Sequence, residues 1–212
     1  MNRINWVIIL CILTSALTWY WGSDVLFGYL AFSGQNLLEG RVWTLVTALF
    51  LHGDVGHLVG NMLFLFVFGN TLENELQANR TLLAFFLGGI VAFLLTPLFY
   101  TPATYAIGAS AAIFTLTAVV MLVKPLKFSF LFLMPQGLVA IIYFLYNVVA
   151  VQLGTTGNIA YTSHIIGFLI GIPLGMAWSR EWAKNLLITI GLLLLYLFLI
   201  WLVVPLLLAI LL

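Results

Sequence analysis

Three apolar stretches of this 212-residue chain carry polar side chains of the kinds that catalyse acyl transfer. The first holds His57 and Asn61, the second holds Ser110 among glycine and alanine, and the third holds His164. A serine hydroxyl is a weak nucleophile unless a neighbouring base, commonly an imidazole, takes its proton. Imidazole and amide N–H groups can stabilise the oxyanion that forms when a carbonyl is attacked. These residue types predict nucleophilic catalysis, provided that the fold brings them together.

The composition requires a membrane around the chain. Hydrophobic residues make up 64% of it and charged residues only 6%, with a mean hydropathy of +1.21. A soluble domain has about 25% charged residues, so seven basic and six acidic side chains cannot solvate this surface. A soluble enzyme, a nucleic-acid-binding protein and a disordered chain are therefore excluded. The single cysteine, Cys11, excludes a disulfide framework, and no zinc or cofactor motif is present.

Seven apolar runs are long enough to predict an all-α polytopic bundle of transmembrane helices. They are Ile4–Trp21, His57–Glu73, Leu82–Tyr100, Ser110–Val123, Phe128–Val151, Ser163–Trp178 and Leu186–Leu212. The first run ends in aromatic residues instead of a small-residue cleavage site, so we expect it to be a span and not a removable signal peptide.

The basic residues predict the orientation of these spans. If the N-terminus is cytoplasmic, six of the seven basic residues lie in inside loops and only Arg41 lies outside. The positive-inside rule then places the C-terminus outside. Of the outside segments, Ser23–Gly56 mixes charged and apolar residues and is expected to dip partly into the interface. Thr101–Gly108 and Gln152–Tyr161 carry no charge and are expected to cover the bundle.

The four polar residues are predicted to share one depth. With a rise of 1.5 Å per residue, Ser110 and His164 lie about 21 and 24 Å above the charged residues that end their helices. His57 and Asn61 lie about 24 and 18 Å above Glu73. In a hydrocarbon core of about 30 Å, all four fall in one layer of the outer half.

The helix faces bring the serine and the histidine together. His164, Gly167, Gly171 and Gly175 recur every three or four residues, so they form one stripe. Glycines allow a partner backbone to approach closely, and small residues also surround Ser110. We therefore expect contact between Ser110 and His164, with the helix N-terminus at the serine favouring an oxyanion. His57 and Asn61, four residues apart, can both donate toward that site.

Each feature alone has an ordinary explanation. A membrane serine often bonds to its own helix, a histidine can be structural or part of a proton or metal site, and a glycine stripe is common packing. A channel or transporter remains an alternative, which would need polar residues along the full membrane depth. A non-catalytic scaffold that binds membrane helices is another. The shared depth and chemistry favour catalysis.

Four motifs in sequence resemble the rhomboid family of intramembrane serine proteases, over residues 41 to about 178. They are Leu51-His-Gly-Asp-Val-Gly-His57-Leu-Val-Gly-Asn61-Met, Gly69-Asn-Thr-Leu-Glu73, Gly108-Ala-Ser110 and His164-Ile-Ile-Gly167-Phe-Leu-Ile-Gly171. The resemblance implies a serine endopeptidase that cuts transmembrane helices of other membrane proteins near the outer face of a cell membrane. It implies membrane-protein substrates and a bilayer as partners, with no cofactor, no metal and no nucleic acid.

The resemblance also implies a role for each site residue. Ser110 would be the nucleophile and His164 the base, in a dyad without a third acid. His57, Asn61 and the Ser110 N–H would form the oxyanion hole. The resemblance gives supporting roles to three further residues, which are His52, Gly108 and Phe114, the last stacking on the base.

The resemblance assigns the remaining segments as well. Residues 1–180 would form a six-helix core and 181–212 an additional transmembrane helix. Ser23–Gly56 would be a membrane-embedded loop, Gln152–Tyr161 a cap, and the fifth helix a lateral gate, while Glu73 would help to hold the bundle together. The sequence departs from the family pattern in Ala111 after the serine, in Phe114 where tyrosine is familiar, and in Arg41 preceding Trp43 by two residues.

Overall fold

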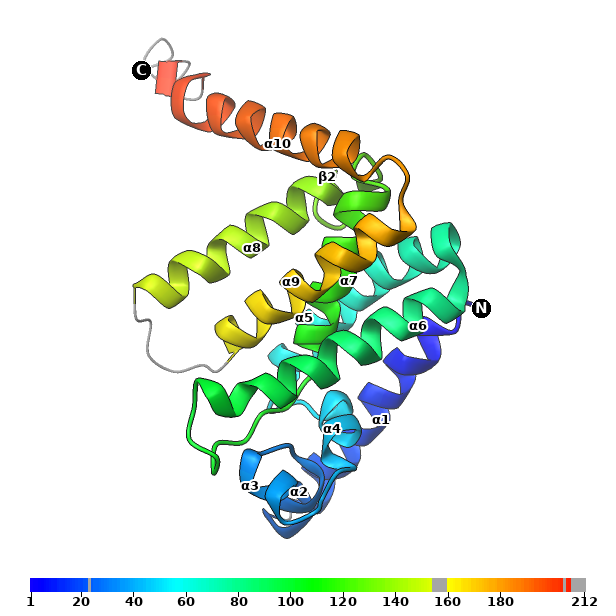
Figure 1. The fold of residues 1–212 in the computed structure, drawn as a ribbon, viewed down its shortest axis with the longest axis vertical. Helices are drawn as coiled ribbons and strands as arrows, with labels where there is room; N and C mark the ends of the chain where they lie inside the picture. The colour runs from blue at the N-terminus through cyan, green and yellow to red at the C-terminus, as the bar shows by residue number, and fades with distance from the viewer. Residues whose placement is uncertain (23, 154–159, 204, 207–212) are drawn as a thin grey trace.

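The computed structural model describes residues 1–22, 24–153, 160–203 and 205–206. Over these residues the chain is a bundle of α-helices with one short β-hairpin (Figure 1). Four helical segments within the described part are long and apolar enough to cross a membrane, namely Ile4–Trp21, Val55–Leu98, Tyr161–Trp178 and Trp182–Val203. The predicted fold class, an all-α polytopic membrane bundle, is confirmed.

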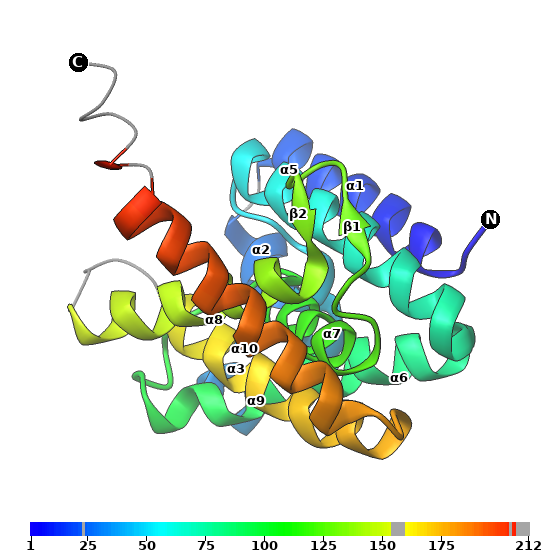
Figure 2. The ribbon, with the colours of Figure 1, turned by 90° about the horizontal axis from the view of Figure 1, so that it is seen from above.

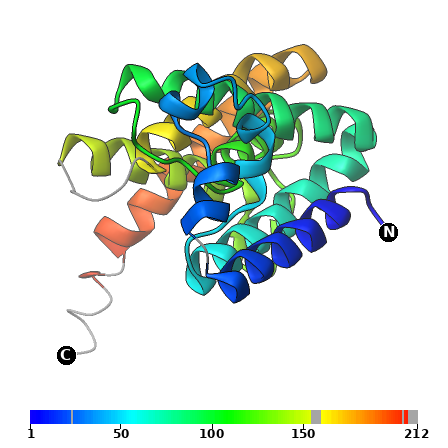
Figure 3. The same cartoon turned by 90° about the horizontal axis from the view of Figure 1, so that it is seen from below.

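The first helix, α1 (Ile4–Trp21), has the predicted bounds and ends at Gly22, whose left-handed backbone (φ 54°) stops the helix. It packs against the next long helical segment, Val55–Leu98 (Figure 3). Its first turn is held by Glu73, whose carboxylate accepts the backbone N–H groups of Arg3 and Ile4 at 2.7 and 2.8 Å. Because the first N–H groups of a helix have no partner within it, Glu73 fixes the start of α1 against the bundle.

The segment Val55–Leu98 consists of α5 (Val55–Phe64), a π-helical turn (Leu65–Gly69) and α6 (Asn70–Leu95). The predicted break after Glu73 comes too early. Helical structure continues to Gln77, where φ of 69° and ψ of 163° interrupt α6 and the chain reverses its direction (Figure 1). A short 3₁₀ turn, Thr96–Leu98, follows directly after α6.

The expected interfacial loop after α1 is built from short helices. They are α2 (Asp24–Leu30), α3 (Gly34–Leu38), α4 (Thr44–Thr47) and the 3₁₀ turn Ala48–Phe50. Arg41 forms an ion pair with Glu39 at 3.1 Å and donates to Asn36 Oδ1 at 3.2 Å. Trp43 Nε1 donates to the Tyr29 carbonyl at 3.0 Å. The arginine and the tryptophan therefore anchor this segment despite their unusual spacing.

His52 ties the end of this segment to α1. Its Nδ1 lies 3.1 Å from Ser15 Oγ, and its carbonyl accepts from Trp19 Nε1 at 2.9 Å. The imidazole is 2% exposed. Burial, and secondarily the positive charge of a protonated His57, lower the pKa of His52 below its ordinary value. Near neutral pH the folded protein therefore favours the neutral form of His52.

The central helix, α7 (Ser110–Val123), has the predicted bounds, and every residue from Ala111 to Leu122 is buried. Its 14 residues span about 21 Å, less than the roughly 30 Å hydrocarbon core. Since other helices surround α7, it does not need to reach both membrane surfaces.

The helix α9 (Ala160–Trp178) packs against α7 through its glycines. A Cβ atom on Gly167 would overlap the Ala111 carbonyl, and one on Gly171 would overlap the Thr115 carbonyl. A Cβ on Gly175 would lie 2.8 Å from Leu122 Cδ1. The predicted glycine face, pressed against the serine-bearing helix, is confirmed.

The fifth span is shorter than predicted. Phe128 does not begin a helix, because Phe128–Ser129 (β1) pairs with Met134–Pro135 (β2) as a hairpin. Leu133 takes a left-handed φ of 55° in the connection, and α8 (Gln136–Gln152) begins directly after Pro135. The sequence pattern missed the hairpin because its exposed phenylalanine and leucine side chains read as membrane residues.

The last described helix, α10 (Trp182–Phe198), begins four residues before the predicted Leu186 and continues as a π-helical turn, Leu199–Val203. Asn185 donates to the carbonyls of Leu122 and Val123 at 2.8 and 3.2 Å, so α10 is fixed to the end of α7. Figure 2 shows α10 lying over the ends of α8 and α9. The division of the chain at residue 180 stays a prediction.

We expect Gly171→Ala to lower the free energy of unfolding by about 1–3 kcal/mol, because its methyl group must displace the α7 backbone. Gly191→Ala is the matched control, since a Cβ there meets nothing within 4 Å. It should be neutral or slightly stabilising, as Ala is the better helix former. Thermal unfolding in detergent measures both, and equal unfolding temperatures would contradict the packing described for α9.

We expect the buried His52 to make the fold less stable in mild acid. A histidine whose pKa is lowered by folding takes up its proton more readily in the unfolded state, so stability present above about pH 6.5 is lost as the pH falls. Each unit of lowering corresponds to about 1.4 kcal/mol. His52→Gln removes this titration, so its unfolding temperature should fall less between about pH 7.5 and about pH 5 than that of the wild type. Parallel curves for the two proteins would show that His52 does not carry the effect.

Candidate active site

Ser110 is the first residue of α7, and the residues before it set its position. Gly108 has a φ of 106°, which favours glycine, and its N–H donates to the Ala48 carbonyl at 2.8 Å. A Cβ on Gly108 would lie 2.9 Å from His57 Nε2. Glycine is therefore required here both by its backbone conformation and by the close approach of the imidazole.

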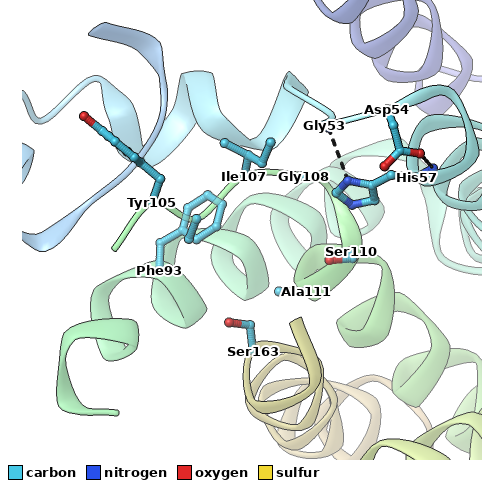
Figure 4. Close-up of a pocket in the computed structure, with 11 residues that line it drawn as sticks. Gly53, Asp54, His57, Phe93, Tyr105, Ile107, Gly108, Ser110, Ala111 and Ser163 are labelled. Atoms are coloured by element: carbon cyan, nitrogen blue, oxygen red, sulfur yellow. Dashed lines mark hydrogen bonds between the residues drawn. The ribbon is translucent and has the colours of Figure 1, made fainter. Parts of the chain in front are cut away.

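Two cavities share Ser110 and His57 in their walls. The first, of about 290 Å³, is lined by Gly53, Asp54, His57, Phe93, Tyr105, Ala106, Ile107, Gly108, Ser110, Ala111 and Ser163. The second, of about 260 Å³, is lined by Gly56, His57, Gly60, Asn61, Phe64, Ser110, Ile113, Phe114, Tyr143 and His164. Figure 4 shows the first cavity, with the His57 ring lying near the Ser110 side chain. All four polar residues expected at one depth line the second cavity.

His164 is held on two sides. Its ring stacks on Phe114 with centroids 4.4 Å apart and planes 10° from parallel. Its Nδ1 lies 2.8 Å from Asn147 Oδ1. The other nitrogen, Nε2, is buried and has no hydrogen-bond partner in the described part of the chain, so no hydrogen bond joins it to Ser110. Catalytic hydrogen bonds are often long or misaligned in enzymes without substrate.

Two donors lie on the α5 side of the second cavity. The Gly53 N–H points at His57 Nδ1 over 3.4 Å (Figure 4), so Nδ1 accepts and, in a neutral ring, Nε2 carries the hydrogen. Asn61 Nδ2 is buried, with no hydrogen-bond partner among the described residues. Asp54 accepts the His57 N–H at 2.8 Å and so begins the helix that presents both side chains.

The other residues of the sequence prediction fall around this centre. His52 is not in the walls of either cavity but packs its ring edge against His57, with centroids 5.0 Å apart. Most of the expected cap, Gln152–Tyr161, lies outside the described residues. Within the described residues no group of three His, Cys, Asp or Glu side chains is placed to hold a metal ion.

Sequence reasoning missed Asn147, the polar partner of His164. It belongs to none of the four motifs and lies on α8, 17 residues before the histidine. A signal existed, because an asparagine in the middle of an apolar membrane helix needs a partner in its own or a neighbouring helix. The sequence alone gave no means of naming that partner.

Comparison with known proteins identifies the family. Residues 39–181 match the family profile described as Rhomboid domain. RHOMBOID-like protein 7 of Arabidopsis thaliana is 28% identical over 156 residues, which are 72% of this chain and 49% of that protein. Rhomboid-like protease 3 of Toxoplasma gondii is 30% identical over 149 residues, 66% of this chain and 53% of that protein.

A bacterial relative, the putative rhomboid protease YdcA of Bacillus subtilis, is 36% identical over 93 residues, 41% of this chain and 45% of that protein. The chain thus spans about half the length of the curated relatives it matches. The profile match covers well over half of the chain and includes all four polar residues of the site. On this evidence the chain, a multi-pass membrane protein, belongs to the rhomboid family.

Proposed function

We propose that this protein is an intramembrane serine endopeptidase that cleaves transmembrane helices of other membrane proteins near the outer face of the bilayer. One observation supports this most strongly. A single cavity is lined by Ser110, His164 and Asn61, and two of these residues carry a nitrogen without a hydrogen-bond partner, His164 Nε2 and Asn61 Nδ2. Both unpartnered atoms belong to the described residues and are buried.

Such groups need an explanation, because a buried polar atom without a partner destabilises the fold by about 1–3 kcal/mol. A reaction whose intermediate provides the missing partners supplies one. An oxyanion accepts from Asn61 Nδ2, and the serine hydroxyl donates to His164 Nε2. The free protein keeps these bonds unmade, so they become available when the substrate carbonyl is attacked.

The first half of the reaction acylates the serine. Ser110 Oγ attacks the carbonyl carbon of the scissile peptide bond while its proton passes to His164 Nε2. The oxyanion receives hydrogen bonds from His57 Nε2, Asn61 Nδ2 and the Ser110 N–H, with the N-terminal end of the α7 dipole adding to the stabilisation. His164 then gives the proton to the leaving nitrogen, the C–N bond breaks, and an ester on Ser110 remains.

The second half consumes water. The first cavity, of about 290 Å³ and bordered by Asp54 and Ser163, can hold several waters, each of which occupies about 30 Å³ of liquid. One water gives a proton to His164 and attacks the ester carbonyl. Collapse of the second oxyanion returns the proton to Ser110 Oγ and releases the carboxylic acid. The two cavities thus suit different reactants, water in the first and the peptide in the second.

A substrate would enter between α5 and α8. The second cavity is walled by Gly56, Gly60 and Phe64 from α5 and by Tyr143 from α8. A Cβ on Gly60 would meet nothing within 4 Å, so side chains do not fill the space directly beside this residue. Because a helix hides its peptide bonds, a substrate must unwind locally, and helix-breaking or small residues near the cut would favour cleavage. In the proposed orientation, with a cytoplasmic N-terminus and an external C-terminus, this site faces the outer leaflet.

A channel or transporter is disfavoured by the hydroxyl groups below the site. In α7, Thr115 donates to the Gly167 carbonyl at 2.7 Å and Thr117 donates to the Phe114 carbonyl at 2.8 Å. Both hydroxyls donate their hydrogen bonds to backbone carbonyls. The other α7 residues from Ala111 to Leu122 are apolar and buried. The polar layer therefore does not continue along the central helix as a conduction path requires.

We expect Ser110→Ala to abolish cleavage of a transmembrane substrate in liposomes and labelling by a fluorophosphonate probe, because both need the hydroxyl. Ser129→Ala is the matched control, as Ser129 is a buried serine of the β1 hairpin and should retain both activities. A non-catalytic helix-binding scaffold predicts no labelling of the wild type. Equal turnover by the wild type and Ser110→Ala would overturn the assignment.

We expect Asn61→Ala to lower the rate without abolishing it, by about 10²–10³-fold, the usual effect of removing one oxyanion donor. Asn61 Nδ2 is buried and makes no hydrogen bond to a described residue, so the substitution removes no hydrogen bond and should not lower the unfolding temperature. The kcat for the liposome substrate and thermal unfolding measure the two quantities. A fall in stability with an unchanged kcat would assign Asn61 to packing instead.

A further inference from the structure

The helix α8 contributes one buried polar group to the surroundings of His164. In the second half of α8, Asn147 is 2% exposed, whereas Tyr146 and Val149 beside it are 58% and 49% exposed. Asn147 therefore points toward the bundle interior, whereas the side chains of Tyr146 and Val149 point away from it. Its amide makes two hydrogen bonds, one within α8 and one to α9.

The first bond fixes which way the amide faces. Asn147 Nδ2 donates to the Tyr143 carbonyl at 2.7 Å. A carbonyl oxygen only accepts hydrogen bonds, so the NH₂ group and not the oxygen of the side chain must lie on that side. The amide oxygen, Oδ1, then faces His164 Nδ1 at 2.8 Å.

The second bond fixes where the histidine holds its proton. An amide oxygen cannot donate, so the hydrogen between Asn147 and His164 belongs to Nδ1 of the imidazole. In the neutral ring the lone pair then lies on Nε2, a buried atom that has no hydrogen-bond partner among the described residues. The opposite tautomer would place a hydrogen on Nε2 and could not accept a proton from Ser110.

We propose that Asn147 is a positioning residue, which selects the tautomer and the orientation of His164 that can act as a base. The proposal rests on the proposed function. Asn147 fixes rotation of the ring about its stacking contact with Phe114, while Phe114 fixes its plane. The third group of the site is thus a neutral amide, which adds no charge to the membrane interior, where an ionised carboxylate is costly.

The placement of Asn147 has a consequence for α8. The asparagine lies on α8 and the histidine on α9, so the hydrogen bond exists only while these two helices keep their present spacing. An outward displacement of α8 breaks the bond and frees the imidazole to rotate. The orientation of the base therefore depends on the position of α8, one wall of the peptide cavity.

The test separates positioning from simple helix packing. Asn147→Leu removes the hydrogen-bond acceptor at similar side-chain volume. It should lower kcat about 10- to 100-fold, the range found for partners that orient a metal-bound imidazole. The KM should change less than about twofold, because Asn147 does not line the peptide cavity. Asn147→Asp keeps an acceptor oxygen at the same chain length and should recover most of the lost kcat. Asn185→Leu is the matched control, a buried asparagine bound to the end of α7. It should lower the unfolding temperature and leave kcat nearly unchanged.

A direct reading of the tautomer completes the test. In protein labelled with ¹⁵N-histidine, we expect the His164 imidazole, assigned by its loss in His164→Gln, to carry its hydrogen on Nδ1 in the wild type. In Asn147→Leu the hydrogen should distribute over both nitrogens. A wild-type His164 with its hydrogen on Nε2, or a kcat unaffected by Asn147→Leu, overturns the proposal. A wild-type protein that neither cleaves a substrate nor reacts with fluorophosphonate refutes the proposed function instead.

Discussion

Close contact between α7 and α9 is the constraint on which the site depends. Gly167 and Gly171 lie so near the α7 carbonyls of Ala111 and Thr115 that a single methyl group would not fit. At this distance Thr115 also reaches the Gly167 carbonyl with its hydroxyl. Since apolar side chains gain little from burial against one another inside a bilayer, such packing and interhelical hydrogen bonds must hold the pair. The packing of α7 against α9 therefore sets the relative position of Ser110 and His164.

The rest of the bundle supplies groups that neither α7 nor α9 can provide. The α5 helix presents its imidazole and amide donors from one face, and its start is fixed by the Asp54 cap. The α8 helix supplies the amide that binds His164 Nδ1. Polar side chains from four helices thus converge in a region otherwise packed with apolar residues. Two of their buried atoms, Asn61 Nδ2 and His164 Nε2, have no hydrogen-bond partner in the described structure.

The membrane setting made much of the fold predictable from the sequence. Bounds of α1 and α7 agree with the apolar runs because each ends at a sharp change of residue type, at Gly22 and at Lys124. The hydropathy pattern failed where an apolar segment is not helical and where a helix is interrupted. Phe128 and its neighbours are apolar but lie in a hairpin. The helix α6 is interrupted at Gln77, where no proline or glycine in the sequence indicates a turn. Hydropathy locates chain in the membrane but does not say where a helix must bend.

By itself, the sequence determined the membrane class and the glycine face of α9, and it predicted a common depth for Ser110, His164, His57 and Asn61, because these follow from composition and from the fixed rise and period of a helix. Only the tertiary structure decided which other residues each of these side chains contacts. It placed Phe114 flat on His164, His57 against Gly108 and Asn147 on Nδ1 of the base. The physical reason is that helix geometry fixes the height and direction of a side chain along its own axis, whereas its partners depend on how separate helices are rotated and spaced against one another.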